Sequence, residues 1–86
     1  MDINQLSKIV KKKILENKLI EKVEILDKSF MHKNHSSNQA GKFHLRLIID
    51  SIELKKKNKV ISNKLIYKIL EEEMKLYIHS IQIVFN

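Results

Sequence analysis

The chain contains no cysteine, no proline, no tryptophan and a single glycine, Gly41. The lack of cysteine excludes disulfide bonds, thiol nucleophiles and thiolate metal ligands supplied by this chain. Small secreted domains usually depend on disulfide bonds, so we expect a reducing compartment and predict a cytoplasmic protein. No apolar run approaches the roughly 18 residues that a membrane-spanning helix needs, and the first residues lack the apolar segment of a secretory signal. We therefore expect no association with a membrane.

The same scarcities argue against an enzyme. A single glycine allows neither a P-loop nor a dinucleotide-binding fingerprint. Ser36, Ser37 and His35 lie together in a polar stretch, but without the G-x-S-x-G pattern that presents a nucleophilic serine. The acidic run 71–73 is expected to be a solvated helix face, whereas catalytic carboxylate pairs need burial to separate their pKa values. We predict a protein that binds and does not catalyse.

Length and charge favour a small module that works through its surface. Eighty-six residues correspond to a single domain, residues 1–86, whose thin core leaves little room for an enclosed substrate pocket. Seventeen basic residues against ten acidic ones give a net charge of +7, and sixteen of the seventeen are lysine. This excess fits codon drift in an AT-rich genome, and it equally fits attraction to an acidic partner, nucleic acid or an anionic surface.

Apolar residues three and four positions apart predict two helices. The first spans 3–20, with Asn17 expected to end it and the lysines at 11–13 mostly outside its buried stripe. The second spans 62–76, with Ser62 as its expected N-cap. Its predicted buried side consists of Leu65, Ile66, Ile69, Leu70 and Met74.

Three strands are predicted, at 21–27, 43–50 and 78–85, with a long loop over 28–42. The first two strands can form an antiparallel hairpin, and the second helix then brings the last strand back parallel to a neighbour. The result is an α+β fold, a two-layer αββαβ sandwich with a three-stranded mixed sheet and both helices on one face. Alternation in the second strand assigns Phe43, Leu45, Leu47 and Ile49 to one face, and His44, Arg46, Ile48 and Asp50 to the other.

The histidines are the candidate metal ligands. His32 and His35 lie in the loop, and His79 lies at the start of the last strand. Imidazoles on a loop and on a strand can supply half of a metal site, so a self-contained site using these three residues is one hypothesis. The alternative for His79 is a structural histidine with a satisfied hydrogen bond. His44 is expected to be simply exposed.

Lysines offer a second candidate surface. Lys55, Lys56, Lys57 and Lys64 could contact the phosphates of a nucleic acid. Several features weigh against this interpretation: the few aromatic residues fall mostly on buried positions, the chain lacks a GXXG loop, and lysine without arginine gives poor base readout.

Four segments together resemble the BolA family. They are DKSFMH at 27–32, FHLRLIID at 43–50, LIY at 65–67 and EEEMKLYIHSIQI at 71–83. The family has a D-x-S-x-x-H loop, an F-x-V-x-[IV]-x-S strand, a helix with A-E-E-L and an [IV]-H-A-[LF] strand, in that order. The resemblance covers about residues 5–85, and the order and intervals of the motifs carry it.

The resemblance implies a class II KH-like fold without the GXXG loop. It also implies a monothiol glutaredoxin of the CGFS type as partner, with a 2Fe–2S cluster shared between the two proteins and glutathione and no cofactor in the isolated chain. The positions that match the family's ligands are His79 and His32, with His35 as a substitute for His32. Imidazole ligation of one iron is known from Rieske centres.

The sequence departs from the family in two places. The Arg-His-Arg that begins the family's second helix is replaced by the residues at 62–64, and the glycine-containing turn before it is replaced by a longer lysine-rich segment from 52. These departures affect the family's suggested DNA-binding surface and leave the proposed ligands intact. The first hypothesis is therefore an adaptor in iron–sulfur trafficking or redox regulation, a monomer or weak homodimer when alone. The alternative is a nucleic-acid-binding transcriptional regulator.

Overall fold

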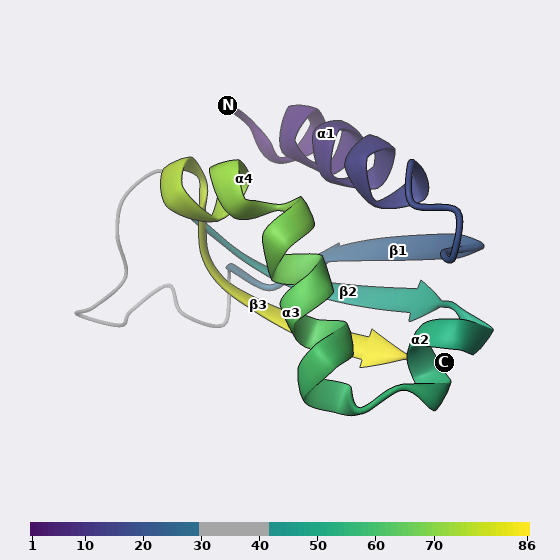
Figure 1. The fold of residues 1–86 in the computed structure, drawn as a ribbon. Coiled ribbons are helices and arrows are strands. Elements are labelled where there is room, and N and C mark those ends of the chain that lie inside the picture. The colour runs from purple at the N-terminus through teal and green to yellow at the C-terminus, as the bar shows by residue number, and fades with distance from the viewer. Residues whose placement is uncertain (30–41) are drawn as a thin grey trace.

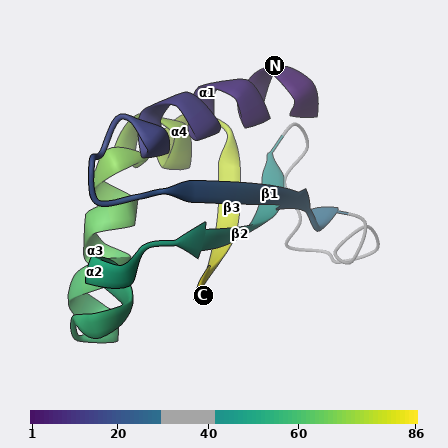
Figure 2. The ribbon, with the colours of Figure 1, turned by 90° about the vertical axis from the view of Figure 1, so that its right-hand side faces the viewer.

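The computed structural model describes residues 1–29 and 42–86 and has the predicted α+β architecture (Figures 1 and 2). The described residues form four helices and three strands, whereas two helices and three strands were predicted. In chain order they are α1 (Ile3–Leu15), β1 (Lys22–Asp27), β2 (Phe43–Asp50), α2 (Ile52–Lys56), α3 (Lys59–Ile69), α4 (Glu71–Leu76) and β3 (Ile78–Phe85). In the described part of the chain no helix is long and apolar enough to cross a membrane.

The sheet has the predicted mixed topology, with β2 between β1 and β3. β1 and β2 are antiparallel, with Ile25 opposite Leu47, and β2 and β3 are parallel, with Leu47 opposite Ile83. The helical segment from α2 to α4 makes the crossover that a parallel pair requires (Figure 1).

The core lies between the helices and one face of the sheet, and the predicted alternation of β2 is confirmed there. Leu45, Leu47 and Ile49 are buried, while Arg46 and Ile48 on the opposite face are partly exposed. The helices bury Leu6, Val10, Ile14, Leu54, Ile66 and Leu70 against this face. A period of two in the strands and one near 3.6 in α1 therefore converge on one apolar layer.

The predicted helix over 62–76 is wrong in its start and in its continuity. The structure has α3 and α4 in this region, and α3 begins after Asn58, whose side-chain oxygen accepts a hydrogen bond from the Val60 amide at 2.8 Å. Ser62 is fully buried inside α3, and its hydroxyl donates to the Leu54 carbonyl at 2.6 Å. Asn58 therefore provides the cap expected of Ser62, and the serine ties α3 to α2 instead.

The segment after β2, for which no helix was predicted, contains the short helix α2. Ser51 caps it by accepting a hydrogen bond from the Leu54 amide at 3.1 Å, and its hydroxyl also donates to the Leu19 carbonyl at 2.6 Å. The first helix likewise ends earlier than 20, at Leu15, with Glu16 as its C-cap. One buried serine thus fixes α2 and the connection from α1 to β1 together.

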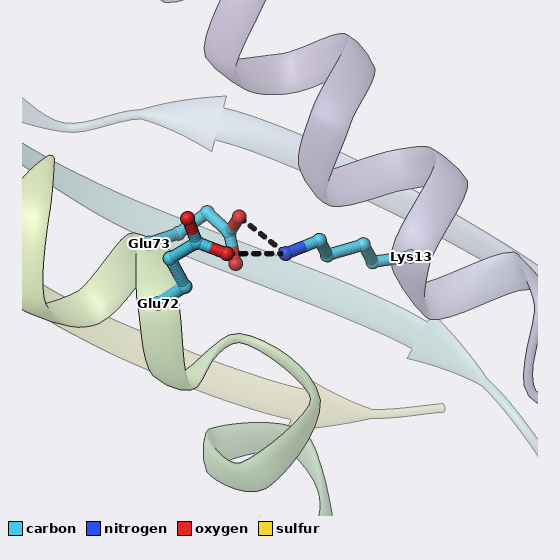
Figure 3. A network of polar contacts seen from close by, with 3 residues as sticks. All are labelled: Lys13, Glu72 and Glu73. Carbon is cyan, nitrogen blue, oxygen red and sulfur yellow. Dashed lines mark hydrogen bonds and ion pairs between the residues drawn. The ribbon is translucent and has the colours of Figure 1, made fainter.

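The acidic run 71–73 is not uniformly solvated, which corrects the prediction. Glu73 is only 4% exposed, and its carboxylate accepts a hydrogen bond from the Lys13 ammonium at 2.5 Å (Figure 3). Glu72, whose side chain is largely exposed, lies 3.7 Å from the same ammonium. The hydrogen bond from Lys13 to Glu73 and the charges of both carboxylates raise the pKa of Lys13 above its ordinary value, although partial burial opposes the shift. This cluster joins α1 to α4.

Candidate functional site

A β-bulge at the start of β3 sets the position of His79. Phe43 pairs with Ile78, but the next residue of β2, His44, pairs with Ser80. His79 is therefore the additional residue on β3 and has no partner on β2. A bulge redirects the side chain at the extra position, and here Ile78 remains buried in the core while His79 is exposed.

The ring of His79 lies against the ring of His44. Their centroids are 4.8 Å apart and the ring planes are tilted by 38°. His44 Nδ1 lies 2.6 Å from Ser80 Oγ, which fixes the ring from the neighbouring strand. His44 is only 5% exposed, so its expected simple exposure is wrong. Strand alternation predicted an outward side chain, and the contact with Ser80 shows that this position is not simply exposed.

Backbone contacts hold the end of β1 beside His44. The Lys28 amide donates to the His44 carbonyl at 2.7 Å, and the His44 amide donates to Ser29 Oγ at 3.1 Å. The Asp27 carboxylate accepts a hydrogen bond from the Ser29 amide at 2.9 Å. The chain thus leaves β1 at the same end of the sheet at which His79 emerges from β3.

A depression of about 190 Å³ lies beside His44, the ring that contacts His79. Arg46 reaches across it, and its Nε donates to the Gln82 side-chain oxygen at 2.9 Å. Among the described residues the lining contains two cations and no carboxylate; it consists of Lys28, His44, Leu45, Arg46, Ser80, Ile81 and Gln82. Such a surface attracts an anionic group next to an exposed imidazole.

The structure does not test whether the predicted histidines bind a metal. His79 is accessible at the surface, whereas His32 and His35 lie outside the described residues. Across 1–29 and 42–86, no three histidine, aspartate or glutamate side chains gather as a metal site. The described residues therefore do not by themselves assemble a metal site around His79, and the contact of His79 with His44 was not predicted. Strand parity alone does not reveal a bulge, so the sequence carried no signal for this pairing.

The four predicted lysines are all exposed, but only two of them line the same cavity. Lys55 and Lys57 line a second cavity, of about 320 Å³, together with Lys59. Lys56 and Lys64 are exposed but do not line this cavity. Lys59 was not among the predicted residues, and its place at the start of α3 brings it into the group.

Comparisons with known proteins agree with the resemblance to the BolA family. The sequence model of the BolA-like protein family matches residues 15–86, and no curated protein matches the chain. Among solved structures, the BolA domain of SufE1 from Arabidopsis thaliana is similar, with a TM-score of 0.76 and 24% identity over 100% of this chain and 93% of that one. BolA1 from Arabidopsis thaliana is also similar, with a TM-score of 0.72 and 23% identity over 92% of this chain and 87% of that one.

The structural similarity establishes the fold, and the sequence match extends over most of the chain, from the end of α1 through β3. Within it lie the bulge, the exposed imidazole of His79 and the contact of that ring with His44. The chain belongs to the BolA-like protein family.

Proposed function

We propose that this protein is an adaptor that binds a monothiol CGFS glutaredoxin and contributes imidazole ligands to a 2Fe–2S cluster shared by the two proteins. The observation that carries the proposal is His79, an exposed imidazole at the unpaired position of a bulge, with its ring supported by His44. Membership of the BolA-like family agrees with this role.

The donor set suits such a cluster. Iron in a 2Fe–2S centre accepts imidazole in place of thiolate, and the chain, which has no cysteine, leaves the thiolates to the glutaredoxin and glutathione. Lys28 and Arg46 beside the histidines provide positive charge for an anionic partner group such as a carboxylate. When bound, the cluster supplies one-electron redox chemistry and a transferable iron–sulfur unit.

In this proposal the residues of this chain bind the cluster and orient its ligands, and they carry out no covalent step. Ser80 fixes His44 through Nδ1, and the His44 ring limits the orientations open to His79. Fixed ligand orientation is what the neighbours of a metal-binding histidine normally provide. A second ligand is proposed to be His32, or His35 in its place; His32 follows Ser29 by three residues, and Ser29 is hydrogen-bonded to His44.

The proposal is tested by titrating the protein into a cluster-loaded CGFS glutaredoxin with glutathione and following visible absorption and circular dichroism. A new spectrum that saturates at one chain per glutaredoxin is expected. His79→Ala should lose it, while Val84→Ala, an exposed position on the same strand, should keep it. The proposal would be refuted if the spectrum did not change and the two proteins did not co-elute.

Nucleic-acid binding is the second candidate, because Lys55, Lys56, Lys57 and Lys64 are all exposed. Its support is charge alone, because the exposed aromatic Tyr67 is already held by its hydroxyl, which donates to the Ile81 carbonyl at 3.3 Å. Phosphate contacts would make the affinity fall steeply with salt. The measurement is a salt series with duplex and single-stranded probes, and no binding at low salt would eliminate this candidate.

A further inference from the structure

The cavity of about 320 Å³ runs along the open edge of the sheet. Four consecutive residues of β3, Gln82–Phe85, line it. Consecutive side chains of a strand point to opposite faces of the sheet, so one cavity can contact all four only by following the edge of the backbone. We call this cavity the β3-edge groove.

β3 is an edge strand within the described residues, with β2 as its neighbour on one side. Pairing with β2 continues to the end of the strand, where the Asn86 amide donates to the Ile49 carbonyl at 2.9 Å. Near Ile81 the outer side is occupied, because the Tyr67 hydroxyl donates to that residue's carbonyl. The groove begins at the next residue, so it opens where this contact ends.

The opposite wall of the groove is basic. It consists of Leu54 and Lys55 of α2, Lys57 after that helix and Lys59 at the start of α3, and no carboxylate of the described residues lines the cavity. Apolar contacts are available as well, from Leu54, Ile83 and Phe85 within the groove and from exposed Val84. The groove therefore offers an edge of peptide groups, apolar side chains and positive charge.

We propose that the β3-edge groove binds an extended, acidic segment of a partner protein, which adds to the sheet as a strand beside β3. An added strand gains main-chain hydrogen bonds from the edge, and its side chains enter the neighbouring pockets. Carboxylates on the added segment pair with Lys55, Lys57 and Lys59. The groove and the depression beside His44 share Gln82, but the centre of the groove is distant from the exposed imidazole, because His79 and Ile83 lie about 13 Å apart along the strand.

The same features disfavour two other occupants. A nucleic acid has no alternating N–H and C=O groups to pair with a strand edge, and it gains little from the apolar wall. A second copy of this chain carries the same net charge of +7 and would bring further lysines toward the groove.

The other sheet edge provides an internal control. A cavity of about 530 Å³ is lined by the consecutive residues 22–25 of β1, and so it also follows a strand edge. It carries Lys8, Lys11 and Lys22, but the carboxylate of Glu24 also lines it. The mixed charge makes this edge the weaker site for an acidic segment.

The test uses the full chain and a fluorescein-labelled peptide of about ten residues in which glutamate alternates with valine. Anisotropy should show saturable binding, and replacing the glutamates with lysine should abolish it. The triple variant Lys55→Gln, Lys57→Gln, Lys59→Gln should weaken binding about tenfold. The matched triple variant Lys8→Gln, Lys11→Gln, Lys22→Gln should change it less than twofold, and circular dichroism checks that both variants fold.

Two N-methylated forms of the peptide test the main-chain pairing, one methylated at every glutamate and the other at every valine. Pairing with an edge uses the N–H groups of alternate residues, so one form should lose binding and the other should retain it. Amide chemical shifts should change at 82–85 and not at 22–25.

Three results would overturn the proposal. They are equal binding by both N-methylated forms and the parent peptide, a loss of binding in the Lys8, Lys11 and Lys22 variant instead, or tighter binding of a single-stranded oligonucleotide at the same residues. None of these results depends on whether His79 binds iron.

Discussion

The imidazole of His79 lies against that of His44, with the ring centroids 4.8 Å apart, although the two residues belong to different strands. The pairing register explains the contact: Ser80, and not His79, is opposite His44, so the bulge turns His79 out of the ladder and over its neighbour. One histidine is exposed and the other is buried beneath it. This division separates a residue available for binding from a residue that supports it.

His79→Ala should leave the fold intact. The side chain is exposed, so the free energy of unfolding is expected to change by no more than about 0.5 kcal/mol. Urea unfolding followed by circular dichroism measures it. A loss of several kcal/mol would mean that His79 is a structural residue, and any loss of cluster binding in this variant would then reflect unfolding.

Ser80→Ala should make the shared cluster more labile without eliminating its binding. The substitution removes the contact from Ser80 Oγ to His44 Nδ1, and its cost to stability is expected to be about 0.5–1.5 kcal/mol. The lifetime of the visible absorption under a chelator challenge reports the change in ligand orientation. Ser80→Thr keeps a hydroxyl and should restore part of the lifetime. Equal lifetimes for all three proteins would show that His44 does not orient His79.

Lys13→Met should destabilise the protein more than Lys12→Met does. Lys12 is exposed on the same helix, whereas Lys13 pairs with the buried Glu73 carboxylate, whose other oxygen has no hydrogen-bond partner among the described residues. Removing one partner leaves a buried charge without compensation. The double variant Lys13→Met, Glu73→Met should recover much of the lost stability in urea unfolding. If the double variant loses at least as much stability as Lys13→Met and Glu73→Met lose together, the two residues are not coupled.

The same ion pair predicts a dependence on alkaline pH. Hydrogen bonding to Glu73 and the nearby carboxylates raise the pKa of Lys13 in the folded state above its ordinary value of 10.5. The stabilisation from this shift is complete below the ordinary value and is lost as the pH rises through the raised one. The stability difference between the wild-type protein and Lys13→Met should therefore be constant near neutral pH and shrink above a pH of about 10.5. A difference that stays constant across this alkaline range would contradict the shift.

Ser62→Ala should cost about 1–3 kcal/mol, because it leaves the buried Leu54 carbonyl without its hydrogen bond from the serine hydroxyl. Lys64→Ala, at an exposed position of the same helix, should stay within about 0.5 kcal/mol. Thermal or urea unfolding distinguishes the two. Equal effects would show that the link between α2 and α3 contributes little.

The sequence was a reliable guide where a repeating pattern carries the information. The alternation over 43–50 predicted β2, and the apolar spacing after Ile3 predicted α1. Helix boundaries were harder to predict, because Asn58 and Ser62 are both good N-cap residues and neither proline nor glycine marks the break near Leu70. The local signals allowed a start at either residue, and packing of Ser62 against Leu54 decided between them.

Local sequence signals were also insufficient to predict the candidate site in full. The position of His79 at the start of the last strand was predictable, but its contact with His44 depends on a one-residue shift in strand pairing that side-chain periodicity does not encode. The burial of Glu73 depends in the same way on Lys13, which lies 60 residues away in the sequence. Both errors concern polar side chains whose environment is set by a partner distant along the chain.

Ligation of the cluster by His79 is tested most directly by pulsed electron paramagnetic resonance of the reduced complex with glutaredoxin, prepared with ¹⁵N-histidine in this chain only. The expected result is a ¹⁵N hyperfine coupling in the wild-type complex that is reduced or lost in His79→Ala. His32→Ala and His35→Ala, measured in the same way, would identify the loop ligand. A wild-type complex without ¹⁵N coupling, or a coupling unchanged in His79→Ala, would contradict the assignment of His79 as a ligand.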